Sequence, residues 1–89
     1  MKKSRNELMN WLNKHMDFVE TTENFSGAEG GIWLSGENGD EYNGRTIYSY
    51  YAQGKAYELG VLNEWEEKLN KWGWYSQWYD CGTIMLYKL

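Results

Sequence analysis

The sequence predicts an α+β protein, a two-layer sandwich with two helices on one face of an antiparallel sheet of four to five strands. Two amphipathic segments have apolar residues at helical spacing, and short segments of strand composition lie between and after them. Turn sequences separate these short segments, which favours hairpins and antiparallel pairing. With 89 residues, no Pro and no internal repeat, the chain is expected to form one domain over residues 1–89.

The first helix is predicted at about residues 5–17. Ser4-Arg5-Asn6-Glu7 matches a capping box, in which Ser4 and Glu7 satisfy each other's backbone N–H groups. One apolar stripe follows at helical spacing, made of Leu8, Trp11, Leu12, His15, Met16 and Val19. His15 lies on or beside this stripe, so a boundary histidine with a backbone or water partner is expected.

Between the helices, three segments have the composition of strands. Residues 18–25 are rich in Thr and Glu and suit an edge strand, while residues 31–37 and 46–51 combine aromatic and β-branched side chains. Residues 52–57 are expected to connect the last of these strands to the second helix.

A two-residue turn at Asn38-Gly39 is predicted to join residues 31–37 to a return strand at residues 40–44, because Asn-Gly favours a type I′ hairpin. The second such pair, Asn43-Gly44, is interpreted as a bulge or an early end of the pairing. The first turn would set two cross-strand pairs, Trp33 with Gly44 and Ser35 with Tyr42.

The second helix is predicted from about Val61 to Trp72. Gly73 suits the left-handed residue just past its end. The helix presents one apolar face, formed by Val61, Leu62, Trp65, Leu69 and Trp72.

A final hairpin is predicted around a three-residue loop, Asp80-Cys81-Gly82, with Gly82 in the left-handed region. One face of this hairpin is expected to pack under the helices, with Trp74, Trp78, Ile84 and Leu86. The other face is amphipathic and half-exposed, and its cross-strand pairs would be Tyr79 with Thr83, Gln77 with Met85, and Tyr75 with Tyr87.

Acidic residues are concentrated in one part of a chain whose net charge is −4. The interval from His15 to Gly44 contains no Lys or Arg, which excludes it as a site for nucleic-acid phosphate and suits a basic protein partner. The alternative is a solvated acidic edge that keeps an aromatic-rich protein in solution. The acidic residues of this interval are Asp17, Glu20, Glu23, Glu29, Glu37, Asp40 and Glu41.

The location of the protein is predicted to be cytoplasmic. The chain has no apolar run of membrane-spanning length, and its basic first residues are not followed by the apolar region of a signal peptide. The single cysteine, Cys81, has no partner for an internal disulfide.

No cofactor, metal or catalytic signature emerges from the sequence. The oxygen-rich stretch 37–43 does not match an EF-hand, and one His and one Cys are too few for a zinc site. Cys81 would need a base such as His15 to act as a nucleophile, and a small turn residue is the simpler interpretation. The glycines fit neither phosphate-binding motif, and a Tyr platform for nucleic acid would lack a basic groove.

The remaining feature is an excess of aromatic residues, six Trp, eight Tyr and two Phe. The Trp residues are expected to form most of the core, whereas Tyr is frequent at protein interfaces. The interface candidates are Tyr75, Tyr79 and Tyr87, with Tyr48, Tyr50 and Tyr51 as further possibilities.

The run from Gly73 to Met85, GWYSQWYDCGTIM, together with the upstream stretch from Trp33 to Gly39, WLSGENG, resembles small acidic proteins of bacteriophages and integrated mobile elements. Those proteins are mostly uncharacterised, so the resemblance assigns no residue roles. It implies a non-enzymatic binder that interferes with a host protein, although this chain is less acidic than the proteins that mimic DNA.

These observations lead us to expect a non-catalytic protein-binding domain that inhibits a host protein through an acidic, aromatic surface. No direct nucleic-acid binding and no membrane association are expected. The alternative is a structural domain that self-associates as a homo-oligomer through its Tyr face, and a small enzyme ranks third. The proposed interaction residues are Glu29, Glu37, Asp40, Glu41, Tyr75, Tyr79 and Tyr87.

Overall fold

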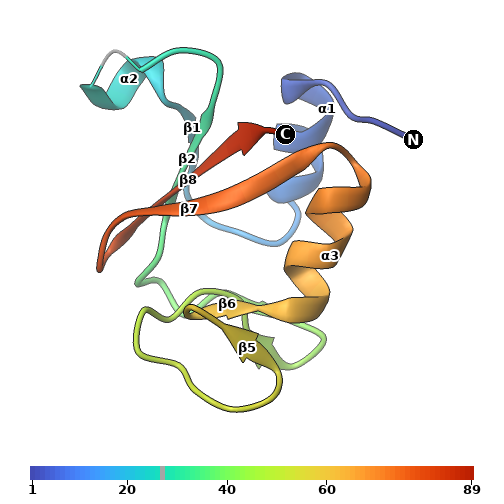
Figure 1. The fold of residues 1–89 in the computed structure, drawn as a ribbon. Coiled ribbons are helices and arrows are strands. Elements are labelled where there is room, and N and C mark those ends of the chain that lie inside the picture. Colours follow the sequence, from blue (N-terminus) through green and yellow to red (C-terminus); the bar gives the residue numbers. More distant parts are fainter. Residues whose placement is uncertain (27) are drawn as a thin grey trace.

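The computed structural model describes residues 1–26 and 28–89, and this part of the chain forms three helices and eight strands (Figure 1). The elements in chain order are α1 (Arg5–Leu12), β1 (Val19–Thr21), α2 (Glu23–Ser26), β2 (Ile32–Ser35), β3 (Glu41–Tyr42), β4 (Arg45–Thr46), β5 (Tyr57–Glu58), β6 (Val61–Leu62), α3 (Asn63–Lys71), β7 (Trp74–Asp80) and β8 (Thr83–Lys88). Four strands form an antiparallel sheet in the order β1-β2-β8-β7, and β3–β4 and β5–β6 form separate two-stranded ribbons. The α+β class and the four-stranded antiparallel sheet are therefore confirmed.

Helix α1 begins with the predicted capping box but ends earlier than predicted. The Glu7 N–H donates to Ser4 Oγ at 3.2 Å, and the Ser4 N–H donates to the Glu7 carboxylate at 2.8 Å. These hydrogen bonds lower the pKa of Glu7. Helix α1 stops at Leu12, whose carbonyl accepts from the N–H groups of both His15 and Met16. The hydrogen bond from His15 spans three residues instead of the four of an α-helix. It therefore tightens the chain into a turn that directs Met16 into the core.

Strand β1 is an edge strand as predicted, but it is shorter than residues 18–25 because the chain turns into α2 at Glu23. The Glu23 side chain holds this turn: one oxygen pairs with Arg5 Nη1 at 2.8 Å, and the other accepts the Gly30 N–H at 3.0 Å. The Gly30 N–H, the residue's own backbone N–H and Arg5 lower the pKa of Glu23 to about 2. The α2 segment is thereby tied to α1.

Strand β2 pairs with β1 and β8, not with residues 40–44. Trp33 lies opposite Glu20 on one side and Met85 on the other, while Ser35 lies opposite Thr83. The predicted Trp33–Gly44 and Ser35–Tyr42 pairs are therefore wrong.

The physical reason for this correction lies in the two Asn-Gly pairs. A type I′ turn requires positive φ at both central residues. Asn43 and Gly44 satisfy this requirement with φ of 54° and 82°, and they close the β3–β4 ribbon. At the first pair only Gly39 has a positive φ, so Asn38-Gly39 belongs to a wider connection.

A second ribbon, β5–β6, was not predicted. The predicted strand at residues 46–51 reduces to Thr46 in β4 and a single bridge between Tyr48 and Val61. The chain then reverses at Leu59-Gly60, which have φ of 52° and 76° and join β5 to β6. This ribbon leads directly into α3.

The end of the chain follows the predicted pattern except at its loop. Gly73 has the expected positive φ of 91°, and the register pairs Tyr75 with Tyr87 and Gln77 with Met85. Asp80, not Tyr79, lies opposite Thr83, because a bulge lies between Trp78 and Asp80. Gly82 is not among the residues with positive φ. Its N–H instead donates to the Asp80 side chain at 3.0 Å, which stabilises a two-residue turn.

The hydrophobic core contains residues of α1 and α3 together with alternate residues of β2 and β8. Trp65 and Trp74 are fully buried, as predicted, whereas Trp33 lies on the other sheet face between Phe18 and Phe25. The cluster of buried residues is Leu8, Leu12, Met16, Ile32, Leu34, Ile47, Tyr48, Val61, Leu62, Trp65, Leu69, Trp74, Ile84 and Leu86. None of the helices in the described ranges is long and apolar enough to cross a membrane.

Candidate protein-interaction site

The acidic residues selected from the sequence do not form one surface. Glu29 precedes β2 and Glu37 follows it, so the length of this strand separates them; Figure 1 shows α2 at one end of the molecule and the β5–β6 ribbon at the other. Glu37 and Glu41 are exposed. Asp40 is half-buried, and its pKa is raised by burial and by the neighbouring Asp17 carboxylate.

The three selected tyrosines also divide between two places. Tyr75 and Tyr87 form a half-buried cross-strand pair with ring centroids 6.3 Å apart. Tyr79 lies in the β7 bulge, where its ring packs 4.8 Å from that of Phe25 in α2. The Tyr87 ring packs closely on Gly31: a Cβ at position 31 would lie only 2.6 Å from that ring. Other side chains of the protein, such as Phe25, therefore cover part of the sheet face that carries these tyrosines.

A second group of apolar side chains, which we call the Trp78 face, consists of Tyr50, Tyr51, Leu59 and Trp78. Two of its members, Tyr51 and Leu59, are more exposed than Tyr79, which is 59% exposed, whereas Trp78 is half-buried. The Tyr50 ring lies 5.2 Å from the rings of both Tyr51 and Trp78, and Trp78 Nε1 donates to the Leu59 carbonyl at 2.7 Å. Tyr51 is 78% exposed and Leu59 is 83% exposed. Clustered exposed aromatic and aliphatic side chains are typical of protein contact sites.

Leu59 combines this exposure with an unfavourable backbone conformation. Its φ of 52° lies in the left-handed region, where a residue with a side chain is less stable by about 1–2 kcal/mol. The hydrogen bond from Trp78 and the neighbouring Gly60 hold the turn. Strain that is stored at an exposed position is a feature of functional sites.

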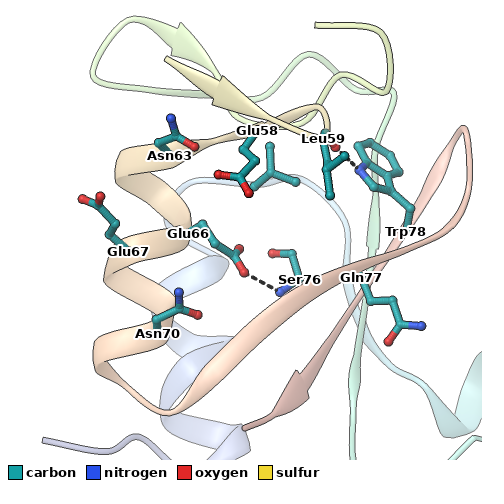
Figure 2. Close-up of a pocket in the computed structure, with 10 residues that line it drawn as sticks. Glu58, Leu59, Asn63, Glu66, Glu67, Asn70, Ser76, Gln77 and Trp78 are labelled. Carbon is teal, nitrogen blue, oxygen red and sulfur yellow. Dashed lines mark hydrogen bonds between the residues drawn. The ribbon is translucent and has the colours of Figure 1, made fainter. Parts of the chain in front are cut away.

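A groove of about 610 Å³ borders the Trp78 face between α3, β7 and the β5–β6 turn (Figure 2). Figure 2 shows Glu58 and Glu66 directed into this space, whereas Glu67 points away from it at the rim. The groove is lined by Glu58, Leu59, Val61, Asn63, Glu66, Glu67, Asn70, Ser76, Gln77 and Trp78.

A partly buried polar network leads from the groove-lining residues Glu66 and Ser76 into the core. Glu66 Oε2 accepts the Ser76 N–H at 3.0 Å, and Ser76 Oγ lies 2.9 Å from the Tyr48 hydroxyl, which accepts from Trp65 Nε1 at 2.9 Å. Burial, with a smaller contribution from the Glu66 charge, raises the pKa of Tyr48. Glu66 Oε1 is buried and has no hydrogen-bond partner in the described part of the chain. This oxygen is therefore a buried acceptor whose hydrogen-bonding capacity is unused.

A shallower cavity of about 410 Å³ lies beside Tyr50 and Tyr51 and includes Glu37, one of the interaction residues proposed from the sequence. Its other lining residues are Gly36, Gly39, Thr46, Tyr48, Ser49 and Cys81. Among the described residues that line this cavity and the groove, none is Lys, Arg or His, and four are Glu. The surroundings of the Trp78 face are therefore acidic.

The groups considered for catalysis and metal binding lie in different surroundings. His15 packs among the rings of Trp11, Tyr42 and Trp65, whereas Cys81 is exposed beside the shallow cavity. Within residues 1–26 and 28–89, no group of three or more His, Cys, Asp or Glu side chains is placed to hold a metal ion.

The sequence contained a signal for one wall of the groove. The residues Asn63, Glu66, Glu67 and Asn70 follow the spacing i, i+3, i+4, i+7, which is a polar stripe on one side of a helix. Leu59 carried no comparable signal, because Leu-Gly is not a typical hairpin turn. Scans of family models, curated proteins and solved structures find no match to this chain. The function is therefore inferred from the geometry of the site.

Proposed function

We propose that this chain is a non-catalytic domain that binds a protein partner through the Trp78 face. The observation that carries the proposal is the exposure of Tyr51 and Leu59 beside Trp78, at a turn whose backbone is strained. Exposed aromatic anchors bury large apolar areas at low entropic cost when a partner covers them. Acidic groups around them favour a partner with a basic surface.

The proposal includes the class of protein that the sequence suggested, a binder of phage or mobile-element type that inhibits a host protein in the cytoplasm. The acidic surroundings of the Trp78 face support a basic target surface, with Glu37 as one contact. We also propose a two-layer architecture in which α1 and α3 lie on one face of the sheet. Buried Leu8 and Leu12 of α1 and Trp65 and Leu69 of α3 join the same cluster as Ile32, Leu34, Ile84 and Leu86, which supports this arrangement.

The Leu59→Gly variant is expected to be more stable than the wild-type chain and to bind its partner less well. Glycine removes the left-handed strain at φ 52°, and this gain exceeds the added unfolded-state entropy by about 0.5 kcal/mol. Loss of an exposed anchor is expected to weaken partner capture by about tenfold. Urea denaturation and quantitative capture from host lysate with the tagged chain measure the two effects.

Two further variants make this test specific to the Trp78 face. Tyr51→Ala removes a second exposed anchor and is expected to weaken capture, whereas Tyr79→Ala, on the other sheet face, should leave it unchanged. Equal capture by Leu59→Gly, Tyr51→Ala and the wild-type chain would contradict the proposal, as would recovery of the chain bound only to itself.

A further inference from the structure

We infer that the groove between α3 and β7 binds an arginine side chain of the partner protein; this inference deepens the proposed function and rests on it. The groove adjoins the Trp78 face, so a partner that covers Leu59 and Trp78 also reaches the groove. Its volume of about 610 Å³ is sufficient for a side chain together with its flanking residues.

The charge of the groove selects a cation. Glu58 and Glu66 are directed into it, and the described residues that line it include no basic side chain to neutralise them. Glu66 is constrained further, because Oε2 accepts the Ser76 N–H while the buried Oε1 has no partner. A buried acceptor without a partner is unfavourable, and a rotation of the Glu66 carboxylate toward a charged donor of the ligand would remove that penalty.

The neutral side chains of the groove favour arginine. A guanidinium has five N–H donors in one plane and stacks on aromatic rings, whereas a lysine ammonium is a compact point charge. The groove offers the side-chain carbonyl oxygens of Asn63 and Asn70, and the Trp78 indole forms an aromatic wall. This combination of charged acceptors, neutral acceptors and an aromatic surface fits a guanidinium.

The structure also opposes binding of the partner as an added strand at this point. β7 is an edge strand, and such edges attract extended peptides through their free backbone groups. Glu66 already occupies the Ser76 N–H on the side away from β8. Recognition in the groove therefore depends on a side chain entering it.

A nuclear magnetic resonance titration of the folded full chain tests the inference. The probes are two capped alanine pentapeptides that differ only at the central residue, which is arginine in one and its neutral analogue citrulline in the other. We expect the arginine peptide to shift the amide resonances of Glu66, Ser76 and Gln77 in a saturable manner. The citrulline peptide should bind at least about tenfold more weakly, since a charged hydrogen bond and ion pair are lost.

Three variants complete the test. Glu66→Gln preserves an acceptor for the Ser76 N–H but removes the charge, so arginine-peptide affinity should fall at least about tenfold. Glu64→Gln, an exposed residue of α3 outside the groove lining, should retain wild-type affinity. Asn70→Lys places a tethered ammonium at the rim of the groove, where it competes with the arginine side chain, so this variant should abolish arginine-peptide binding. It keeps the test valid if Glu66→Gln does not fold.

Equal binding of the two peptides, or amide shifts confined to residues outside the groove, would overturn the inference. If partner capture still depended on Leu59 and Tyr51 in that case, the proposed function would stand and only the arginine site would fail. Arginine-peptide binding that required Glu66, in a chain whose partner capture ignored Leu59, would instead support the site and contradict the Trp78 face.

Discussion

Replacement of Trp65 by alanine is expected to reduce the free energy of unfolding by about 3–5 kcal/mol, a large part of the stability of a domain of this size. Trp65 is fully buried, and its ring packs 4.8 Å from Trp11 and 5.4 Å from Tyr42. Its Nε1 also donates to the Tyr48 hydroxyl at 2.9 Å, so the change leaves a cavity and removes the donor from a buried hydroxyl group.

Urea denaturation followed by far-ultraviolet circular dichroism measures this effect. Trp72→Ala is the matched control, because Trp72 belongs to the same region but is only half-buried, with Lys3 and Lys68 over its ring. A loss for Trp65→Ala no larger than that for Trp72→Ala would show that the Trp65 network does not form the centre of the core.

Replacement of Gly60 by alanine is expected to have the next largest effect. Gly60 has a φ of 76°, and a Cβ there would lie 2.5 Å from the Ser49 carbonyl oxygen and 3.0 Å from the Tyr50 Cα. Both atoms belong to the backbone and cannot rotate away, so the β5–β6 turn must move from residues 49–50. Because that turn carries Leu59 and borders the groove, partner binding should weaken together with stability.

Gly39→Ala separates the contribution of this contact from that of the backbone angle. Gly39 has a similar φ of 73°, but no atom lies within 4 Å of its added Cβ. Both variants bear the left-handed strain, whereas Gly60→Ala should lose roughly 1–3 kcal/mol more because of the overlap. Equal denaturation midpoints for the two variants would contradict the close approach of the turn to Ser49.

The parts of the fold that local sequence determines were predictable. The Ser4 capping box and the left-handed Gly73 depend on residues close in the chain, and both were confirmed. The β7–β8 register was predictable for Tyr75 and Tyr87 for the same reason. The bulge at Tyr79 was missed because the Asp80 side chain accepts the Gly82 N–H and permits a shorter turn than glycine alone suggested.

The partner of β2 could not be predicted from local turn signals. Its neighbour β8 lies about fifty residues later, and the Asn38-Gly39 pair suggested a closer partner. Two Asn-Gly pairs within seven residues offered two possible hairpins, and packing of β2 into the central sheet decided between them. Tertiary burial of Ile32 and Leu34 between β1 and β8 outweighed the local turn preference.

The candidate site was only partly accessible from the sequence. Tyr50 and Tyr51 are interface candidates by residue type alone, whereas only the exposure and the φ of Leu59 make it a candidate. A linear run of acidic residues suggested one surface, but β2 separates Glu29 from Glu37. The groove depends on Glu58 and Glu66, which lie outside that run and meet only in the folded chain.

Hydrogen exchange of the chain, alone and in complex with the partner captured from host lysate, locates the binding surface. The proposed function predicts slower exchange on binding in three segments, residues 49–51, 58–60 and 76–78, which meet at the Trp78 face. Protection confined to Tyr75, Tyr87 and the strand positions around them, with no change at residues 49–51 and 58–60, would contradict it and place the interface on the other face of the sheet.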